Sequence, residues 1–244
     1  MKTFAFIPAR YGSSRFPGKP LALIAKKPMI QHVYERTVSC PDVYQVYVAT
    51  DDERIRDCVT GFGGNALITD SSHRSGTDRI CEAARKIGLD KDDIVVNVQG
   101  DQPLFNNALV SQLIAPLMEE RNVPISTLKW RIEREEDIHN PNHVKVITDT
   151  QGFAIYFSRH AIPYVRNGER KHDFFKHLGV YAYRMDFLAT FTNLPQGILE
   201  TAEKLEQLRA LEHGFKIKVV ETEYNSIEVD IPEDIEKVES ILKG

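Results

Sequence analysis

Strand-like and helix-like segments alternate through the first 120 residues, and this alternation constrains the fold more than any other feature of the sequence. Short runs rich in Val, Ile and aromatic residues, each closed by Pro, Asp or Gly, predict strands at 3–7, 45–49, 65–68 and 94–98. Apolar residues at helical spacing predict the intervening helices at 28–39, 53–59 and 78–87. The order predicts an α/β fold with a mostly parallel sheet covered by helices on both faces. In such a fold, ligands bind beyond the carboxyl ends of the strands.

The second half of the chain is less regular. It predicts strands at 125–130, 144–148, 154–157 and 178–183, separated by loops that contain Pro and Gly. A helix is expected at 199–213, and a last helix is expected to begin at Pro232. We interpret the 244 residues as a single domain, in which the region 125–200 extends the sheet and forms a small lobe.

Charge and composition exclude several classes of protein. The chain has 31 Lys and Arg against 35 Asp and Glu, and this balance disfavours nucleic acid as a partner. No apolar run approaches the ~18 residues of a membrane span, so membrane insertion is not expected. Cys40, Cys58 and Cys81 are odd in number and far apart in the sequence, so we expect neither a disulfide framework nor a CxxC metal site. The N-terminal apolar run is too short for a signal peptide, and we expect a cytoplasmic protein.

A loop of small and basic residues follows the first predicted strand, at 8–20. The small residues at 12–14 let backbone N–H groups approach an anion, and Arg10, Arg15 and Lys19 can neutralise a polyphosphate. The alternative is a basic surface loop, but its position directly after the first strand favours a triphosphate site.

Two aspartates also follow extended runs. Asp101 comes after the strand at 94–98, and Asp230 comes between the run 226–229 and the start of the last helix. Each has an ordinary alternative, since Asp is common in turns and at helix caps. Mg²⁺ is often held by one or two carboxylates together with substrate phosphates, so the basic loop favours a metal role for this pair.

Eight segments, in register over nearly the whole chain, carry a resemblance to a known family. They are PARYGSSRFPGKP (8–20), HRSGTDR (73–79), VNVQGDQP (96–103), NPNHVKV (140–146), YFSRHAIP (156–163), HLGVYAYR (177–184), LEQLRALEHG (205–214) and VDIPEDIEKV (229–238). Together they closely resemble the 3-deoxy-manno-octulosonate (Kdo) cytidylyltransferases. The related CMP-sialic acid synthetases share the PAR opening but not RFPGKP or HLGVY.

The resemblance implies a three-layer, Rossmann-like nucleotide-diphospho-sugar transferase fold and a homodimer, with the lobe as the dimerisation region. It implies transfer of CMP from CTP to the anomeric hydroxyl of Kdo, with release of pyrophosphate, for lipopolysaccharide synthesis. The reaction is an in-line attack on the α-phosphorus without a covalent intermediate, and Mg²⁺ is the implied cofactor. The catalytic positions implied are Arg10, Arg15, Lys19, Asp101 and Asp230, of which Asp101 and Asp230 hold the metal. The positions implied for CTP are Pro8, Ala9, Arg10, Ser14, Arg15, Lys19, Ser75, Gly76, Thr77 and Gln99.

For the sugar acid, the matching positions are Gln99, Arg159, His177, Tyr181, Glu203, Glu206 and Gln207. An arginine can form two hydrogen bonds to a carboxylate, and residues three and four apart on a helix share one face. We therefore expect Glu203, Glu206 and Gln207 to share a face of the helix predicted at 199–213. The alternatives are a solvated helix face and, for His177, a buried core histidine.

Three departures from the usual family pattern concern the sugar. Gln102 replaces the Glu of GDEP, Glu228 precedes the VD pair, and 199–203 reads LETAE where LExIE is usual. These changes resemble the branch that activates 8-amino-3,8-dideoxy-manno-octulosonate. An acid such as Glu228 or Glu203 can pair with the ammonium of that sugar.

Two other functions stay open at this point. One is a cytidylyltransferase for a different acidic sugar, and the other is a non-catalytic nucleotide-binding regulator. Both acidic positions, Asp101 and Asp230, favour an enzyme, because a binder needs no metal at the reacting phosphate.

Overall fold

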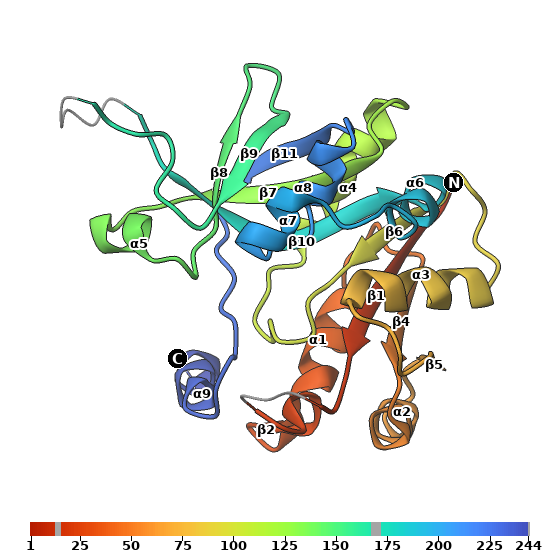
Figure 1. The fold of residues 1–244 in the computed structure, drawn as a ribbon. Helices are drawn as coiled ribbons and strands as arrows, with labels where there is room; N and C mark the ends of the chain where they lie inside the picture. The colour runs from red at the N-terminus through yellow and green to blue at the C-terminus, as the bar shows by residue number, and fades with distance from the viewer. Residues whose placement is uncertain (13–15, 167–171, 244) are drawn as a thin grey trace. The chain divides into compact units, whose positions relative to one another are not determined.

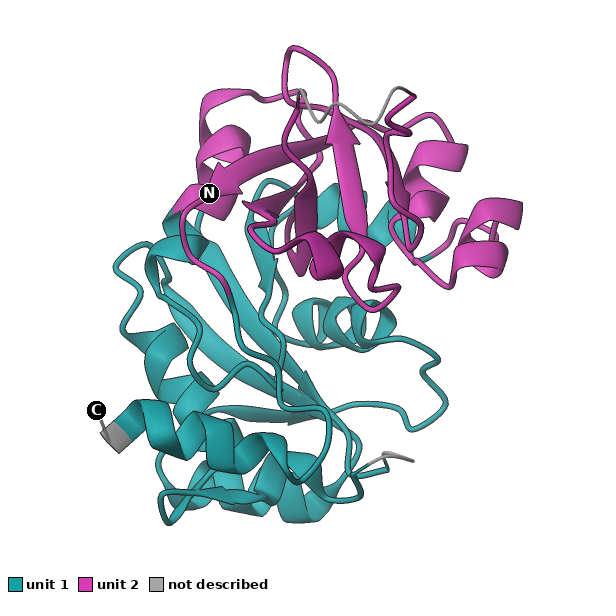
Figure 2. Ribbon diagram, turned by 90° about the vertical axis from the view of Figure 1, so that its left-hand side faces the viewer, with its two compact units in different colours: residues 1–111, 184–192, 226–244 teal, residues 112–183, 193–225 magenta. Residues whose placement is uncertain are grey.

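The computed structural model describes residues 1–12, 16–166 and 172–243, and the chain divides into two compact units (Figures 1 and 2). Unit 1 comprises Met1–Ser111, Arg184–Thr192 and Ser226–Gly244, and unit 2 comprises Gln112–Tyr183 and Asn193–Asn225. Helix α4 (Ala108–Glu119) begins in the first and ends in the second. Within the described ranges, no helix has the length and apolar character needed to cross a membrane.

Four parallel strands form the sheet of unit 1. Their order is β6 (Ile94–Asn97), β1 (Thr3–Ala9), β4 (Gln45–Thr50) and β5 (Ala66–Ile68). Phe6 in β1 pairs with Asn97 on one side and with Tyr47 on the other. Phe6 and Ile7 are fully buried, as expected for strands with both faces covered. The predicted strands are confirmed, with ends that shift by one or two residues.

Helices pack against this sheet. They are α1 (Met29–Val38), α2 (Glu53–Gly61), α3 (Gly76–Lys86) and α6 (Met185–Phe191). Unit 1 also has a 3₁₀ turn η1 (Lys19–Leu21) and a hairpin of β2 (Leu23–Ile24) and β3 (Lys27–Pro28), and α9 (Asp234–Lys243) packs beside β2. The prediction that the last helix begins at Pro232 is wrong, because a turn occupies 231–233. The Asp234 carboxylate accepts hydrogen bonds from the N–H groups of Asp230 and Ile231, so the helix begins at Asp234.

Unit 2 holds a mixed sheet. Strand β7 (Ile125–Arg131) pairs in parallel with β11 (Ile217–Thr222) and antiparallel with β10 (Phe175–Arg184). Strand β8 (Lys145–Thr148) pairs antiparallel with β9 (Ala154–Ser158), and α5 (Glu135–His139) lies between β7 and β8 in the chain. The four predicted strands of this half are present, and the sequence reasoning missed β11.

The single helix predicted at 199–213 is wrong. The chain forms two short helices, α7 (Ile198–Glu203) and α8 (Leu208–Glu212), and Lys204 between them has a left-handed backbone with φ 55°. Arg209 makes two hydrogen bonds to the buried Glu200 carboxylate, at 2.8 and 2.6 Å. Nine residues of continuous helix would place these side chains on opposite faces, so the break lets them meet.

Candidate active site

A pocket of about 310 Å³ lies in unit 1, at the carboxyl ends of the parallel strands. Most of the positions predicted for CTP and metal line it, namely Pro8, Ala9, Arg10, Lys19, Ser75, Gly76, Gln99, Asp101 and Asp230. Other lining residues were not predicted to have a role: Pro20, His73, Arg74, Arg79 and Gly100. The placement agrees with the expectation that ligands bind beyond this edge of the sheet.

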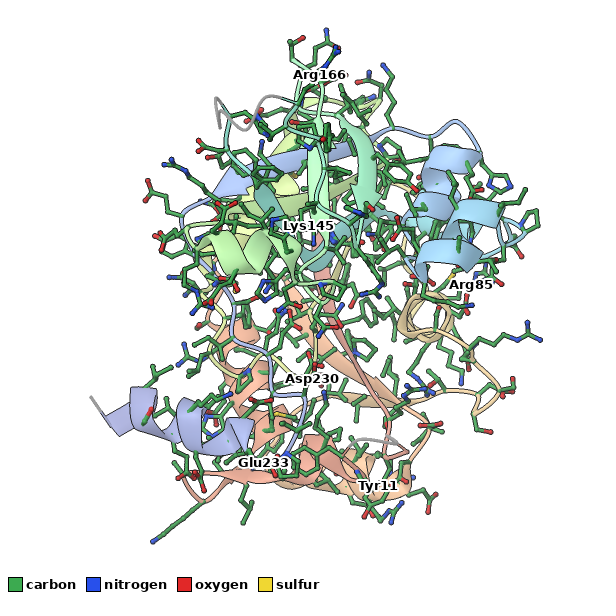
Figure 3. The ribbon with its side chains drawn as sticks, turned by 60° about the vertical axis from the view of Figure 1, so that its left-hand side comes forward. Tyr11, Arg85, Lys145, Arg166, Asp230 and Glu233 are labelled. Carbon is green, nitrogen blue, oxygen red and sulfur yellow. The ribbon has the colours of Figure 1, made fainter. Side chains whose placement is uncertain are left out.

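Lys19 links the two predicted acidic residues. Its Nζ lies 2.7 Å from Asp101 Oδ2 and 3.8 Å from Asp230 Oδ1, and it donates a hydrogen bond to the Val229 carbonyl. The Val229 N–H in turn donates to the Asp101 carbonyl at 2.9 Å, which fixes Asp230 beside the end of β6 (Asp230 is labelled in Figure 3). Two carboxylates that are distant in the sequence therefore face one cation.

This pair fits a magnesium ion by the chemistry of its donors. Two carboxylates with phosphate oxygens form the all-oxygen set that Mg²⁺ prefers. In the described ranges, no group of three or more His, Cys, Asp and Glu side chains is arranged to hold a metal, so phosphate oxygens and water would complete the coordination. The Lys19 ammonium offsets part of the negative charge of the two acids.

The local backbone explains why Lys19 occupies this position. Gly18 has a φ of 72°, and its N–H donates to the Tyr11 carbonyl at 2.9 Å, which closes the loop and starts η1 at Lys19. Ser14 and Arg15 lie outside the described residues, so their phosphate contacts stay predictions.

The first turn of α3 forms another wall of the pocket. The Ser75 hydroxyl caps the helix by accepting a hydrogen bond from the Asp78 N–H at 3.1 Å. A Cβ on Gly76 would lie 3.2 Å from Cγ of Pro8, so only a glycine fits easily beside β1. Thr77 is buried in the same turn. Gly76 and Arg79, on the same helix, line the pocket.

Unit 2 contains a second cavity, of about 620 Å³, which holds two of the predicted sugar contacts. It is lined by His139, Pro141, Arg159, His160, Ala161 and Glu203. The Glu203 carboxylate accepts hydrogen bonds from the Ser158 hydroxyl (2.6 Å) and the Arg159 N–H (3.0 Å). The Arg159 guanidinium donates to the carbonyls of Glu203 and Pro141.

A buried lysine supports this second cavity. Lys145 is fully buried and donates to the carbonyls of Asn140 (2.9 Å) and Arg159 (2.7 Å); it is labelled in Figure 3. Burial lowers the pKa of its ammonium, and the Glu203 carboxylate opposes this effect. The sequence signal was a lysine inside an otherwise apolar strand, and no role was predicted for it.

His177 and Tyr181 form a buried cluster on β10. The Thr127 hydroxyl donates to the Val180 carbonyl, so the His177 ring must donate its Nε2–H to Thr127 Oγ1, at 2.8 Å. Burial lowers the pKa of His177 to about 3, which keeps the ring neutral. Gly179, with a φ of 65°, forms a bulge between the two residues, and their rings lie 5.3 Å apart.

The remaining predicted sugar contacts are dispersed. Burial raises the pKa of Tyr181 well above its ordinary value, and the nearby Tyr183 and Glu206 add to this effect. Gln207 is buried at the start of α8, and Glu228 is exposed in unit 1. The prediction that Glu203, Glu206 and Gln207 share one helix face is wrong, because the chain leaves the helical path at Lys204.

Comparisons with known proteins agree with this geometry. The cytidylyltransferase family pattern matches residues 4–219. A 3-deoxy-manno-octulosonate cytidylyltransferase from Desulfatibacillum aliphaticivorans is 55% identical over 243 residues, which cover 100% of this chain and 99% of that protein. An 8-amino-3,8-dideoxy-manno-octulosonate cytidylyltransferase from Shewanella piezotolerans is 52% identical, with 99% of each chain covered.

Solved structures of cytidylyl-transferring enzymes also superpose on this chain. A CMP:2-keto-3-deoxy-manno-octonic acid synthetase, solved in complex with CTP, superposes with a TM-score of 0.94 at 43% identity, covering 100% of this chain and 99% of that one. A 4-diphosphocytidyl-2C-methyl-D-erythritol synthase from Anaerococcus prevotii, at 14% identity and a TM-score of 0.63, covers 100% of this chain and 97% of that one and shares the fold.

Proposed function

The chain belongs to the 3-deoxy-manno-octulosonate cytidylyltransferases, and from this premise we propose that it transfers CMP from CTP to an octulosonic acid in lipopolysaccharide synthesis. The sugar's anomeric oxygen forms a bond to the α-phosphorus while the bond from that phosphorus to the pyrophosphate oxygen breaks. The proton of the anomeric hydroxyl passes to solvent water, and pyrophosphate leaves as the second product. The observation that carries the proposal is the Lys19 ammonium between Asp101 and Asp230, at the carboxyl ends of the strands.

In this proposal, the pocket of unit 1 binds CTP. Arg10 and Lys19 neutralise the phosphates, together with Arg15 and the Ser14 backbone, while Pro8, Ala9, Ser75, Gly76, Thr77 and Gln99 surround the nucleoside. Asp101 and Asp230 hold Mg²⁺, which when bound stabilises negative charge on the transferring and leaving phosphates. The contribution of the protein is alignment and charge stabilisation, and the Lys19 ammonium is placed in the pocket where it can donate a hydrogen bond to a phosphate oxygen.

We assign the sugar acid to unit 2, at Arg159, His177, Tyr181, Glu203, Glu206 and Gln207. The neutral His177 ring suits hydrogen bonding to a hydroxyl, since its Nδ1 is an acceptor when Nε2 carries the proton. Arg159 retains N–H groups beyond its carbonyl contacts, and these suit a carboxylate.

For the acceptor, we propose the 8-amino sugar ahead of Kdo. The support is the neutral Gln102 beside Asp101, the additional acid Glu228 two residues before Asp230, and the 52% identity with the Shewanella relative. The two acids that we consider for pairing with the ammonium of that sugar are Glu228 and Glu203.

We also propose a cytoplasmic homodimer. Ile155 and Tyr164 are 57% and 86% exposed within the region 125–200, which supports a contact between copies there. Cys40, Cys58 and Cys81 are free thiols, as expected in a reducing compartment. Light scattering should give twice the mass of one chain.

The test of the proposed function is pyrophosphate release from CTP with Kdo and, in parallel, with its 8-amino analogue, with controls that lack sugar or Mg²⁺. Sugar-dependent release establishes the reaction, and the sugar with the higher kcat/KM is the substrate. A clear preference for Kdo would contradict the assignment to the amino sugar. No release with either sugar would leave a cytidylyltransferase for another acidic sugar or a nucleotide-binding regulator.

A further inference from the structure

An arginine that the proposed reaction does not use lines the pocket of unit 1. Arg79 is 4% exposed and lies on α3, one helical turn after Ser75 and on the same face. Its Nη1 donates to the Thr69 hydroxyl at 2.6 Å, and its Nη2 lies 3.1 Å from Asp51 Oδ2. The Thr69 hydroxyl donates its own hydrogen to the Thr50 carbonyl, which fixes it as an acceptor for Arg79. The guanidinium is therefore held in one orientation.

The strand order places Arg79 away from the acidic pair. Asp101 follows β6, whereas Asp51 and Thr69, which hold Arg79, follow β4 and β5 on the other side of β1. Strands β6 and β4 are two strand spacings apart, or roughly 10 Å. A nucleoside triphosphate whose phosphates lie at Lys19 and Asp101 would extend its base along the strand ends toward Arg79.

The chemistry of the guanidinium suits one pyrimidine. Arginine has five N–H donors and no acceptor, and Thr69 and Asp51 use only part of this set. Cytosine presents two adjacent acceptors, O2 and N3, which match a pair of parallel N–H groups. Uracil carries a hydrogen on N3, so it never presents two adjacent acceptors, and that hydrogen would point at a donor.

We propose that Arg79 is a specificity-determining residue that selects cytosine over uracil by donating to O2 and N3 of the base. Asp51 and Thr69 orient it for this contact. The proposal rests on the proposed function only in taking CTP as the nucleotide bound in this pocket. The competing role is purely structural, an ion pair that fastens α3 to the ends of β4 and β5.

The unmodified protein provides the first test. Isothermal calorimetry with Mg²⁺ measures the Kd of CTP, UTP and 3-deaza-CTP, in which a C–H group replaces N3. We expect 3-deaza-CTP to bind roughly 10- to 100-fold more weakly than CTP, since a hydrogen bond to a charged donor is lost. Equal binding of CTP and 3-deaza-CTP would overturn the proposal, whatever sugar the enzyme uses.

The second test changes the arginine. Arg79→Lys keeps the charge but loses the planar pair of donors. It should weaken CTP binding roughly 10- to 100-fold and change UTP binding by less than about threefold. The ratio of the UTP Kd to the CTP Kd should therefore decrease. Equal weakening of both nucleotides would show a structural role instead. Arg85→Lys, an exposed arginine on the same helix (Figure 3), is the matched control and should leave both affinities unchanged.

Both tests measure binding without the acceptor sugar. Failure of the proposed reaction would appear as absent pyrophosphate release with intact CTP binding. Failure of this inference would appear as release with an unchanged preference for CTP over UTP in Arg79→Lys. Circular dichroism of Arg79→Lys checks its fold, and the analogue series on the unmodified protein decides the question if the variant does not fold.

Discussion

Charge balance at single residues shapes the pocket of unit 1, which we propose to bind CTP. The Lys19 ammonium reduces the repulsion between the carboxylates of Asp101 and Asp230. The backbone of η1 positions Lys19, and the hydrogen bond from the Val229 N–H to the Asp101 carbonyl holds the two acidic segments together. Asp101→Asn keeps the shape of the side chain and removes a charge. We expect kcat/KM for pyrophosphate release to fall roughly 10²- to 10³-fold, because an electrostatic contact to the reacting phosphates is lost.

The unfolding midpoint of Asp101→Asn should stay within a few degrees of the wild type, since the carboxylate is partly exposed. Near-normal turnover in this variant would contradict the metal role of Asp101. A loss of turnover together with a loss of CTP binding and of the folded state would leave that role undecided, and Asp230→Asn then provides the equivalent measurement.

The buried His177 makes stability depend on pH. Its pKa is lowered to about 3 by burial, against an ordinary value of 6.5, so below pH 6.5 the unfolded chain binds a proton that the folded chain excludes. The contribution to the free energy of unfolding is complete above pH 6.5 and is lost as the pH falls toward 3. Between pH 6.5 and 5 the loss should be about 2 kcal/mol.

Urea unfolding at several pH values measures this effect. His177→Gln has no titrating ring, so its free energy of unfolding should fall less steeply than that of the wild type over the same interval. His213→Gln, at an exposed histidine, is the matched control. Identical pH profiles for the wild type and His177→Gln would show that His177 is not the responsible group.

At the scale of elements, a side chain of one helix caps another. The Glu212 carboxylate at the end of α8 accepts hydrogen bonds from the N–H groups of Leu199 (2.9 Å) and Glu200 (3.1 Å) in the first turn of α7. Gly197 precedes this turn, and a Cβ there would overlap the Glu212 carboxylate. An alanine at this position would therefore displace the capping carboxylate.

A double-mutant cycle tests this cap. Gly197→Ala and Glu212→Ala should each lower the unfolding midpoint by about 2–4 °C, a shift of the size expected for a lost helix cap in a chain of this length. The double variant should unfold close to Glu212→Ala, because the cap is lost only once. Additive shifts would mean that the two positions act independently.

The same elements show what local sequence can predict. The strands of unit 1 were predictable because buried parallel strands are continuous apolar runs that end in turn residues, and Asp101 was predictable because it follows such a strand. The break at Lys204 was not predictable, since the Glu200–Arg209 ion pair that favours it forms only in three dimensions. Arg79 was missed because a single arginine in a helical pattern is typical of a solvated surface.

At the scale of the whole molecule, the chain returns to unit 1 with its last segment, 226–244, and this return adds Asp230 to the lining of the pocket of unit 1. Val229 and Val238 are fully buried and pack in one cluster with Ile24 and Met29. Asp230 follows Val229 directly, so the packing of α9 and the position of a proposed metal ligand depend on the same apolar contacts. Sequence motifs identified Asp230, but its anchoring is a property of the complete fold.

Val238→Ala tests this dependence away from the pocket. Removing two buried methyl groups should lower the free energy of unfolding by about 2 kcal/mol. Hydrogen exchange should increase across 226–243, and kcat/KM should fall because Asp230 and the Val229 carbonyl are held less firmly beside Lys19. Ile241→Ala shortens a side chain that is 51% exposed on the same helix, and it should leave stability, exchange and activity unchanged. If Val238→Ala loses stability but retains full kcat/KM at limiting Mg²⁺, then Asp230 does not depend on this packing for its position, and the contacts of Lys19 and Asp101 alone hold it in place.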